Sequence, residues 1–114
     1  MQVSDIRTFV PCKDFAQSQL FYQSLGFTLD AAGDDLCLAQ MGDCYLFLQR
    51  YYLPEFAENM MLQIIVDDID DAFAQIKRLP MPARYEPIKQ EPWGKVIYLW
   101  GPAGELLHIT ELNK

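Results

Sequence analysis

The chain has 114 residues, 51% of them hydrophobic and 22% charged, and a formal net charge of −7 at pH 7. This length and composition fit one folded domain and exclude a wholly disordered or fibrous protein. An acidic chain without Lys/Arg patches is not expected to bind nucleic acid, and no apolar run approaches the roughly 20 residues that cross a bilayer. The N-terminal residues lack a secretory-signal pattern, so we expect a cytoplasmic protein.

The first part of the chain predicts a strand, a helix and further strands. A strand is expected over residues 6–10, and Asp14 is a good N-cap for a helix from Phe15 to Leu25. Gly26 supplies the left-handed residue that ends this helix. Two apolar stretches then predict strands separated by Gly- and Asp-rich turns, at residues 36–40 and 45–50.

The segment 51–60 separates this first part from the second and is predicted to be a linker. Pro54 is a structure breaker, and the segment also carries Tyr51, Tyr52 and Phe56. Aromatic residues in a connecting loop either cover the core or contact a ligand, and the sequence leaves both interpretations open.

The second part repeats the order of the first. A strand is expected over residues 61–66, Asp68 caps a helix over 69–79, and two strands follow at 95–100 and 106–110. We therefore expect one domain built of two modules, residues 1–50 and 61–114, that bury their apolar faces together. A cleft between such modules is the first place to look for a binding site.

Alternation along the predicted strands indicates which side chains share a face of the sheet. One face is apolar, whereas the other also carries polar groups. This pattern suits a curved sheet with helices outside and a cleft on its concave side. The polar-bearing face comprises Tyr45, Phe47 and Gln49 in the first module, and Met61, Gln63, Ile65, Leu106, His108 and Thr110 in the second.

Two groups of residues have simple structural explanations. The aspartates at 67, 68, 70 and 71 fit helix capping and first-turn charge better than a cation site. Cys12, Cys37 and Cys44 lack the spacing of a zinc knuckle and form an odd set, which favours free thiols. A reactive Cys12 just before a helix start is the alternative.

Several motifs resemble those of a known superfamily. They are the run Phe9 to Phe15, Leu20-Phe21-Tyr22, Leu25-Gly26-Phe27, Glu91-Pro92-Trp93-Gly94 and the run Gly101 to His108. Together they resemble the vicinal-oxygen-chelate superfamily, which includes glyoxalase I, extradiol dioxygenases and bleomycin-resistance proteins, and they are most similar to the bleomycin-resistance branch. The resemblance implies an α+β fold in which two βαβββ modules form a curled mixed sheet around a cleft. It also implies a homodimer.

The resemblance further implies where metal ligands would lie in the enzymes of this superfamily. Those positions fall on Arg7, on Gln49 or Phe47, on Met61 and on His108. Arg has no lone pair to donate, Met is a poor ligand for a hard ion, and one imidazole cannot hold a catalytic metal. We therefore expect no metal and no other cofactor, and an enzymatic activity is doubtful.

The leading hypothesis is a non-catalytic protein that sequesters a small molecule in a groove at a dimer interface. The net charge favours a cationic guest. Trp93 fits a core or dimer-interface role slightly better than a ligand contact, and His108 fits a hydrogen-bonded wall residue better than a catalytic base. The expected ligand-binding residues are the aromatic walls Tyr45, Phe47, Trp93, Tyr98 and Trp100 and the polar anchors Arg7, Gln49, Gln63 and His108.

Two other classes of function stay open. One is a metal-dependent lyase or dioxygenase of the glyoxalase type, with ligands from unexpected positions such as Glu111, Glu105 or Asp43. The other is an accessory domain that binds a protein or metabolite and has no role in resistance. Because one fold hosts many functions, the resemblance does not choose among them.

Overall fold

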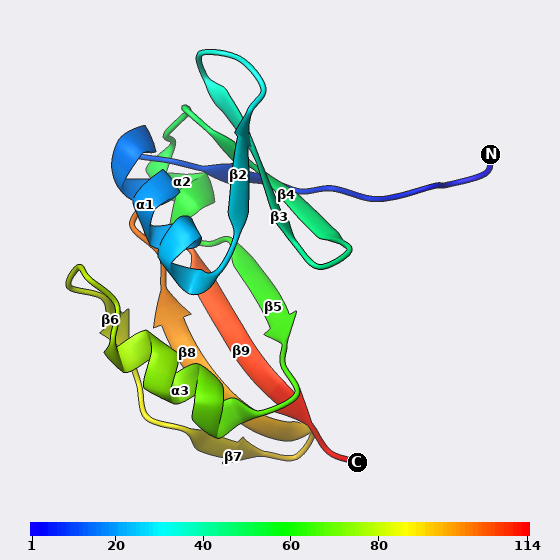
Figure 1. The fold of residues 1–114 in the computed structure, drawn as a ribbon, viewed down its shortest axis with the longest axis vertical. Helices are drawn as coiled ribbons and strands as arrows, with labels where there is room; N and C mark the ends of the chain where they lie inside the picture. The colour runs from blue at the N-terminus through cyan, green and yellow to red at the C-terminus, as the bar shows by residue number, and fades with distance from the viewer.

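A computed structural model describes residues 1–114, the whole chain, and contains the two expected modules (Figure 1). The N-terminal module consists of β1 (Phe9–Pro11), α1 (Phe15–Leu25), β2 (Thr28–Ala31), β3 (Leu36–Met41) and β4 (Cys44–Gln49). Its strands form a sheet in the order β1-β4-β3-β2, with β1 parallel to β4. The first strand begins at Phe9 and not at Ile6 as predicted, since the backbone pairs with β4 only from there.

Helix α1 starts and stops where its local sequence predicts. The Asp14 carboxylate accepts a hydrogen bond from the Gln17 N–H at 3.0 Å, which satisfies one of the free amides of the first turn. Gly26 ends the helix with a φ of 115°, a conformation that residues with a Cβ rarely adopt.

The linker contains a short helix that the sequence analysis did not predict. Helix α2 spans Pro54–Ala57, with Pro54 in its first turn. Proline has no N–H to leave unsatisfied there and its φ is already helical, so it begins this helix and does not interrupt one. Ala57 is fully buried, which ties the linker to the body of the protein.

The C-terminal module consists of β5 (Met61–Ile65), α3 (Ile69–Lys77), β6 (Arg84–Tyr85), β7 (Lys89–Glu91), β8 (Gly94–Trp100) and β9 (Leu106–Leu112). The sheet order is β5-β9-β8-β6, β7 also pairs with β8, and β5 is parallel to β9. Asp68 caps α3 by accepting hydrogen bonds from the N–H groups of Asp70 and Asp71. This bonding supports the capping explanation of the acidic run.

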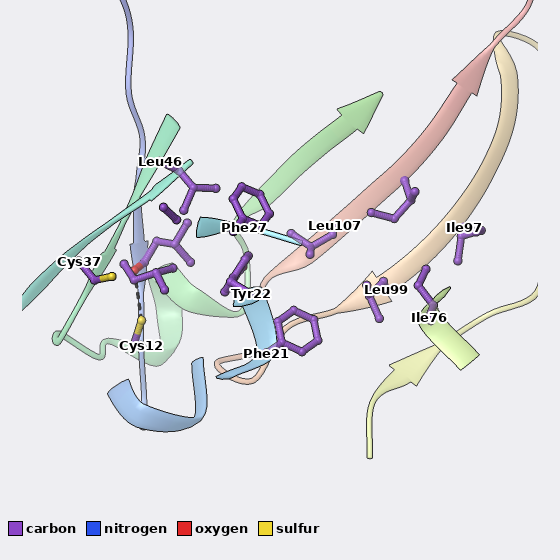
Figure 2. Close-up of a cluster of buried hydrophobic side chains, with 14 of the residues drawn as sticks. Cys12, Phe21, Tyr22, Phe27, Cys37, Leu46, Ile76, Ile97, Leu99 and Leu107 are labelled. Atoms are coloured by element: carbon purple, nitrogen blue, oxygen red, sulfur yellow. Dashed lines mark hydrogen bonds between the residues drawn. The ribbon is translucent and has the colours of Figure 1, made fainter. Parts of the chain in front are cut away.

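The helices cover one side of the sheets, and a single core joins the modules. In Figure 1, α1 and α2 lie against the N-terminal sheet, while α3 lies across β8 and β9. Sixteen buried residues from both modules form one hydrophobic cluster. Figure 2 shows Phe21, Tyr22 and Phe27 of the N-terminal module beside Leu99 and Leu107 of the C-terminal module. The expected α+β fold is therefore confirmed, and no helix has the length and apolarity needed to cross a membrane.

Candidate functional site

Each sheet turns one face toward the helices and leaves the opposite face uncovered within the chain. In the C-terminal sheet, Gln63, His108 and Tyr98 lie directly across from one another on β5, β9 and β8. Trp100 lies on the same face, opposite Leu106, because side chains two residues apart on a strand point the same way. We call this surface the C face; its members are Met61, Gln63, Arg84, Tyr98, Trp100, Leu106 and His108.

The N-terminal sheet has an equivalent surface, the N face, formed by Arg7, Phe9, Leu38, Tyr45, Phe47 and Gln49. Phe9 and Phe47 stack there, with ring centroids 4.8 Å apart and ring planes at 20°. The Arg7 guanidinium lies 4.5 Å from the centroid of the Tyr45 ring, and its Nε lies 3.0 Å from an Asp5 carboxylate oxygen. The N face is thus an aromatic surface with one neutralised cation.

A pocket of about 390 Å³ lies at the seam between the modules, where the β3–β4 hairpin meets the free edge of β5. Its size is at the lower end of the range that holds drug-sized molecules. Eight of the ten lining residues are hydrophobic, and none has a charged side chain. We call it the seam pocket; it is lined by Thr8, Phe27, Met41, Cys44, Tyr45, Leu46, Leu62, Gln63, Ile64 and Ile65.

The structure places most of the predicted ligand-binding residues on the N face or the C face. Tyr45 and Gln63 line the seam pocket, and they also belong to the N face and the C face respectively. Trp93 is separate from them. It lies in the β7–β8 turn, at the opposite end of β8 from Trp100, and is 48% exposed. The role of each of these residues in ligand binding stays a prediction.

His108 sits in the C face in an unusual state. Its ring meets the edge of Tyr98 with centroids 5.1 Å apart, and its Nε2 atom is buried without any hydrogen-bond partner. The prediction that His108 is a hydrogen-bonded wall residue is therefore wrong for its Nε2 atom. Because buried polar atoms are nearly always paired, the unpaired nitrogen leaves one hydrogen bond unmade in the single chain.

Arg84 was not among the predicted site residues. Its guanidinium lies 3.9 Å from the centroid of the Trp100 ring, and it forms no ion pair in the structure. The contact depends on β6, a two-residue strand that pairs Arg84 with Trp100. No apolar alternation indicates so short a strand, so the sequence held no signal for this residue.

The residues considered as metal ligands do not gather in one place. Arg7, Phe47 and Gln49 lie on the N face, whereas His108 and Met61 lie on the C face. No group of three or more His, Cys, Asp or Glu side chains is arranged to hold a metal ion. Two of the three alternative ligands are engaged elsewhere: the Glu111 carboxylate accepts a hydrogen bond from the Ile69 N–H at 3.0 Å, and the Glu105 carboxylate accepts one from the buried Tyr22 hydroxyl.

The three cysteines are free and differ in accessibility. Cys12 and Cys37 are buried, and burial raises the pKa of each thiol. A raised pKa reduces the thiolate fraction, which argues against the reactive Cys12 that the sequence left open. Cys44 is exposed and lines the seam pocket, so it is the one accessible thiol at this site.

Comparison with known proteins supports the fold. No protein-family model and no curated protein matches the sequence. The structure is similar to a bleomycin resistance determinant encoded on the transposon Tn5, with a TM-score of 0.83 and 21% identity over 98% of this chain and 100% of that one. It is similar to the bleomycin-binding protein from bleomycin-producing Streptomyces verticillus complexed with copper(II)-bleomycin, with a TM-score of 0.82 and 21% identity over 99% of both chains.

A lyase shares the same fold. Lactoylglutathione lyase from Agrobacterium tumefaciens matches with a TM-score of 0.74 and 18% identity over 96% of this chain and 95% of that one. The fold expected from the superfamily resemblance is thereby confirmed, and the TM-scores with the bleomycin resistance determinant and the bleomycin-binding protein are higher than the TM-score with the lyase. Because binding proteins and an enzyme share it, function has to be argued from the site.

Proposed function

We propose that this protein binds a small molecule without transforming it, in a groove that a second copy of the chain completes. The observation that carries the proposal is an uncharged, largely apolar pocket whose lining includes Tyr45 of the N face and Gln63 of the C face. Pockets for small molecules combine apolar walls with a few oriented polar groups. Here Gln63, whose side chain is exposed, supplies such a polar group.

Exposed apolar side chains favour completion of the groove by a second copy. Phe9 on the N face is 44% exposed, and Met61 and Ile65 on β5 are 64% and 59% exposed. Large exposed apolar side chains that lie close together usually mark an interaction surface, and Met61 and Ile65 lie on the same side of β5. Since closed symmetric dimers are the commonest oligomers, a homodimer is the simplest way to cover them.

Binding without chemistry is favoured because no reactive pair of side chains forms at the site. His108 is the single imidazole of the chain, and its buried Nε2 contacts no nucleophile. The buried thiols Cys12 and Cys37 carry raised pKa values and face the core. Nucleophilic catalysis requires a base within hydrogen-bond reach of its nucleophile.

The guest that suits this site has an apolar, flat body and a cationic group at its edge. The seam pocket offers no charge, and the rings of Tyr45, Phe47 and Tyr98 offer flat surfaces. A positive group of the guest would suit the net charge of −7.

Titration calorimetry tests this function. Metal-stripped protein is titrated with metal-free bleomycin and, in parallel, with Zn²⁺, Ni²⁺ and Mn²⁺. We expect stoichiometric binding of the drug and slower alkylation of Cys44 in its presence, because Cys44 lines the pocket. Uptake of one metal ion per chain would instead support the lyase or dioxygenase alternative, and no heat with bleomycin would show that the guest is of another kind.

A further inference from the structure

We propose that Tyr22 and Glu105 are positioning residues that fix the two modules relative to each other and thereby set the shape of the seam pocket. The arrangement of the two modules is a property of the ligand-free protein. Only the statement that the pocket binds a ligand rests on the proposed function. The two side chains join α1 of the N-terminal module to the β8–β9 connection of the C-terminal module.

Both carboxylate oxygens of Glu105 accept hydrogen bonds. The Tyr22 hydroxyl donates to the Glu105 Oε2 atom at 2.8 Å, and the Ala103 N–H donates to Oε1 at 3.0 Å. Both Tyr22 and Glu105 are 0% exposed. Gly101 makes room for the carboxylate, since a Cβ at this position would overlap the Glu105 side chain. The β8–β9 connection is therefore shaped around a buried acid.

A buried acid of this kind is a poor source of stability. Burial raises the pKa of Glu105, although hydrogen bonds from Tyr22 and the backbone oppose the shift, and burial also raises the pKa of Tyr22 well above its usual value. The phenol therefore stays protonated and remains a donor. Because the desolvation cost offsets much of the hydrogen-bond energy, such pairs can act mainly by selecting one arrangement of the parts they join.

The pair is linked to the seam pocket through one aromatic contact. The Tyr22 ring meets the edge of Phe27 with centroids 5.7 Å apart, and Phe27 lines the pocket. The other hydrogen bonds from a side chain of one module to the other module run from Gln75 Nε2 to the Leu25 carbonyl at 3.0 Å and to the Ser24 carbonyl at 3.5 Å. Without the Tyr22 bond, hydrogen bonds would hold α1 to the other module only at its C-terminal end, and the remaining orientation would depend on apolar packing in the shared core, which is not directional.

Distance measurements between spin labels test the proposal without any ligand. One label is placed on the exposed Cys44, and the second on Lys95→Cys in β8; the buried Cys12 and Cys37 are protected from labelling. Double electron–electron resonance is recorded on labelled protein diluted with unlabelled protein, which removes distances between copies. The variants are Tyr22→Phe, Glu105→Gln and, as a matched control, Tyr85→Phe, whose hydroxyl makes no hydrogen bond within the protein.

We expect one narrow distance distribution in the parent chain and in Tyr85→Phe, and a broader or shifted distribution in Tyr22→Phe. Unfolding temperatures recorded alongside identify variants that fold. A lower unfolding temperature with an unchanged distance distribution would mean that the pair only adds stability, which overturns the proposal. If Tyr22→Phe does not fold, Glu105→Gln decides the question by the same criterion, since it keeps the length of the side chain.

Discussion

The two modules both begin with a strand and a helix and continue with strands, but their helices bury different numbers of residues. Helix α1 buries Phe15, Ser18, Phe21 and Tyr22 and reaches into the joint core, whereas α3 buries only Ile69 and Ile76 and carries acidic residues in its first turn. Both faces combine aromatic and polar side chains: the N face carries Arg7 and Gln49 beside its aromatic rings, and the C face carries Gln63, Arg84 and His108 beside Tyr98 and Trp100. The modules therefore differ more in how their helices contribute to the core than in the chemistry of their open faces.

Matched core truncations give the largest expected effect and test whether the modules depend on each other. Leu48 on β4 and Leu107 on β9 occupy the last strands of their modules, and both are fully buried. Leu48→Ala and Leu107→Ala should each lower the free energy of unfolding by about 3 kcal/mol, because each leaves a cavity. Urea denaturation followed by far-ultraviolet circular dichroism should show a single transition in both variants.

Two separate transitions, with each variant shifting only one, would contradict a shared core. The modules would then be independently folding units.

A pair of tryptophan variants tests the role of the C face. Trp100 lies on this face beneath Arg84, whereas Trp93 lies in the β7–β8 turn. Trp100→Ala should weaken binding of metal-free bleomycin about tenfold or more, since a buried aromatic side chain contributes on the order of 2 kcal/mol. Since the structure separates Trp93 from the C face, Trp93→Ala should leave the dissociation constant within about twofold, and a loss as large as that of Trp100→Ala would support the ligand contact or dimer contact predicted for Trp93 from the sequence. Titration calorimetry measures the dissociation constant of each variant. Equal losses of affinity would mean that the C face is not the centre of the binding site.

The helix caps provide the smallest expected effect. Asp14 accepts one amide hydrogen bond at the start of α1, and Asp68 accepts two at the start of α3. Asp14→Ala and Asp68→Ala should each cost about 1 kcal/mol of unfolding free energy. Thermal unfolding of the variants, with Asp43→Ala in an exposed turn as control, measures this cost. A loss at Asp68 no larger than in the control would reopen the alternative that the acidic run serves another purpose.

Features set by near neighbours were predictable from the sequence. Asp14, Asp68 and Gly26 act within one helical turn, and alternation placed Tyr45, Phe47 and Gln49 on one face as found. Strand ends and short elements were less predictable: β2, β6, β7 and α2 are short and lack a clear period, so nothing local distinguishes them from loops.

Features set by distant partners could not be predicted. Glu105 was considered as a metal ligand, yet its carboxylate bonds with Tyr22, 83 residues away in the sequence. Trp100 was expected as an open aromatic wall, but Arg84 lies over its ring. The unpaired nitrogen of His108 depends on which residues surround β9 in space, a property that no spacing along the chain encodes.

The parallel pairing of the outer strands has a consequence for the biosynthesis of the chain. Met61 in β5 pairs with Leu106 in β9, so the second sheet is incomplete until β9 has left the ribosome. The N-terminal sheet can close earlier, because β1 needs only β4. Phe21 and Tyr22 would then stay exposed on the nascent chain until Leu99 and Leu107 arrive. The late strands are therefore also the cover that shields the early module from aggregation during synthesis.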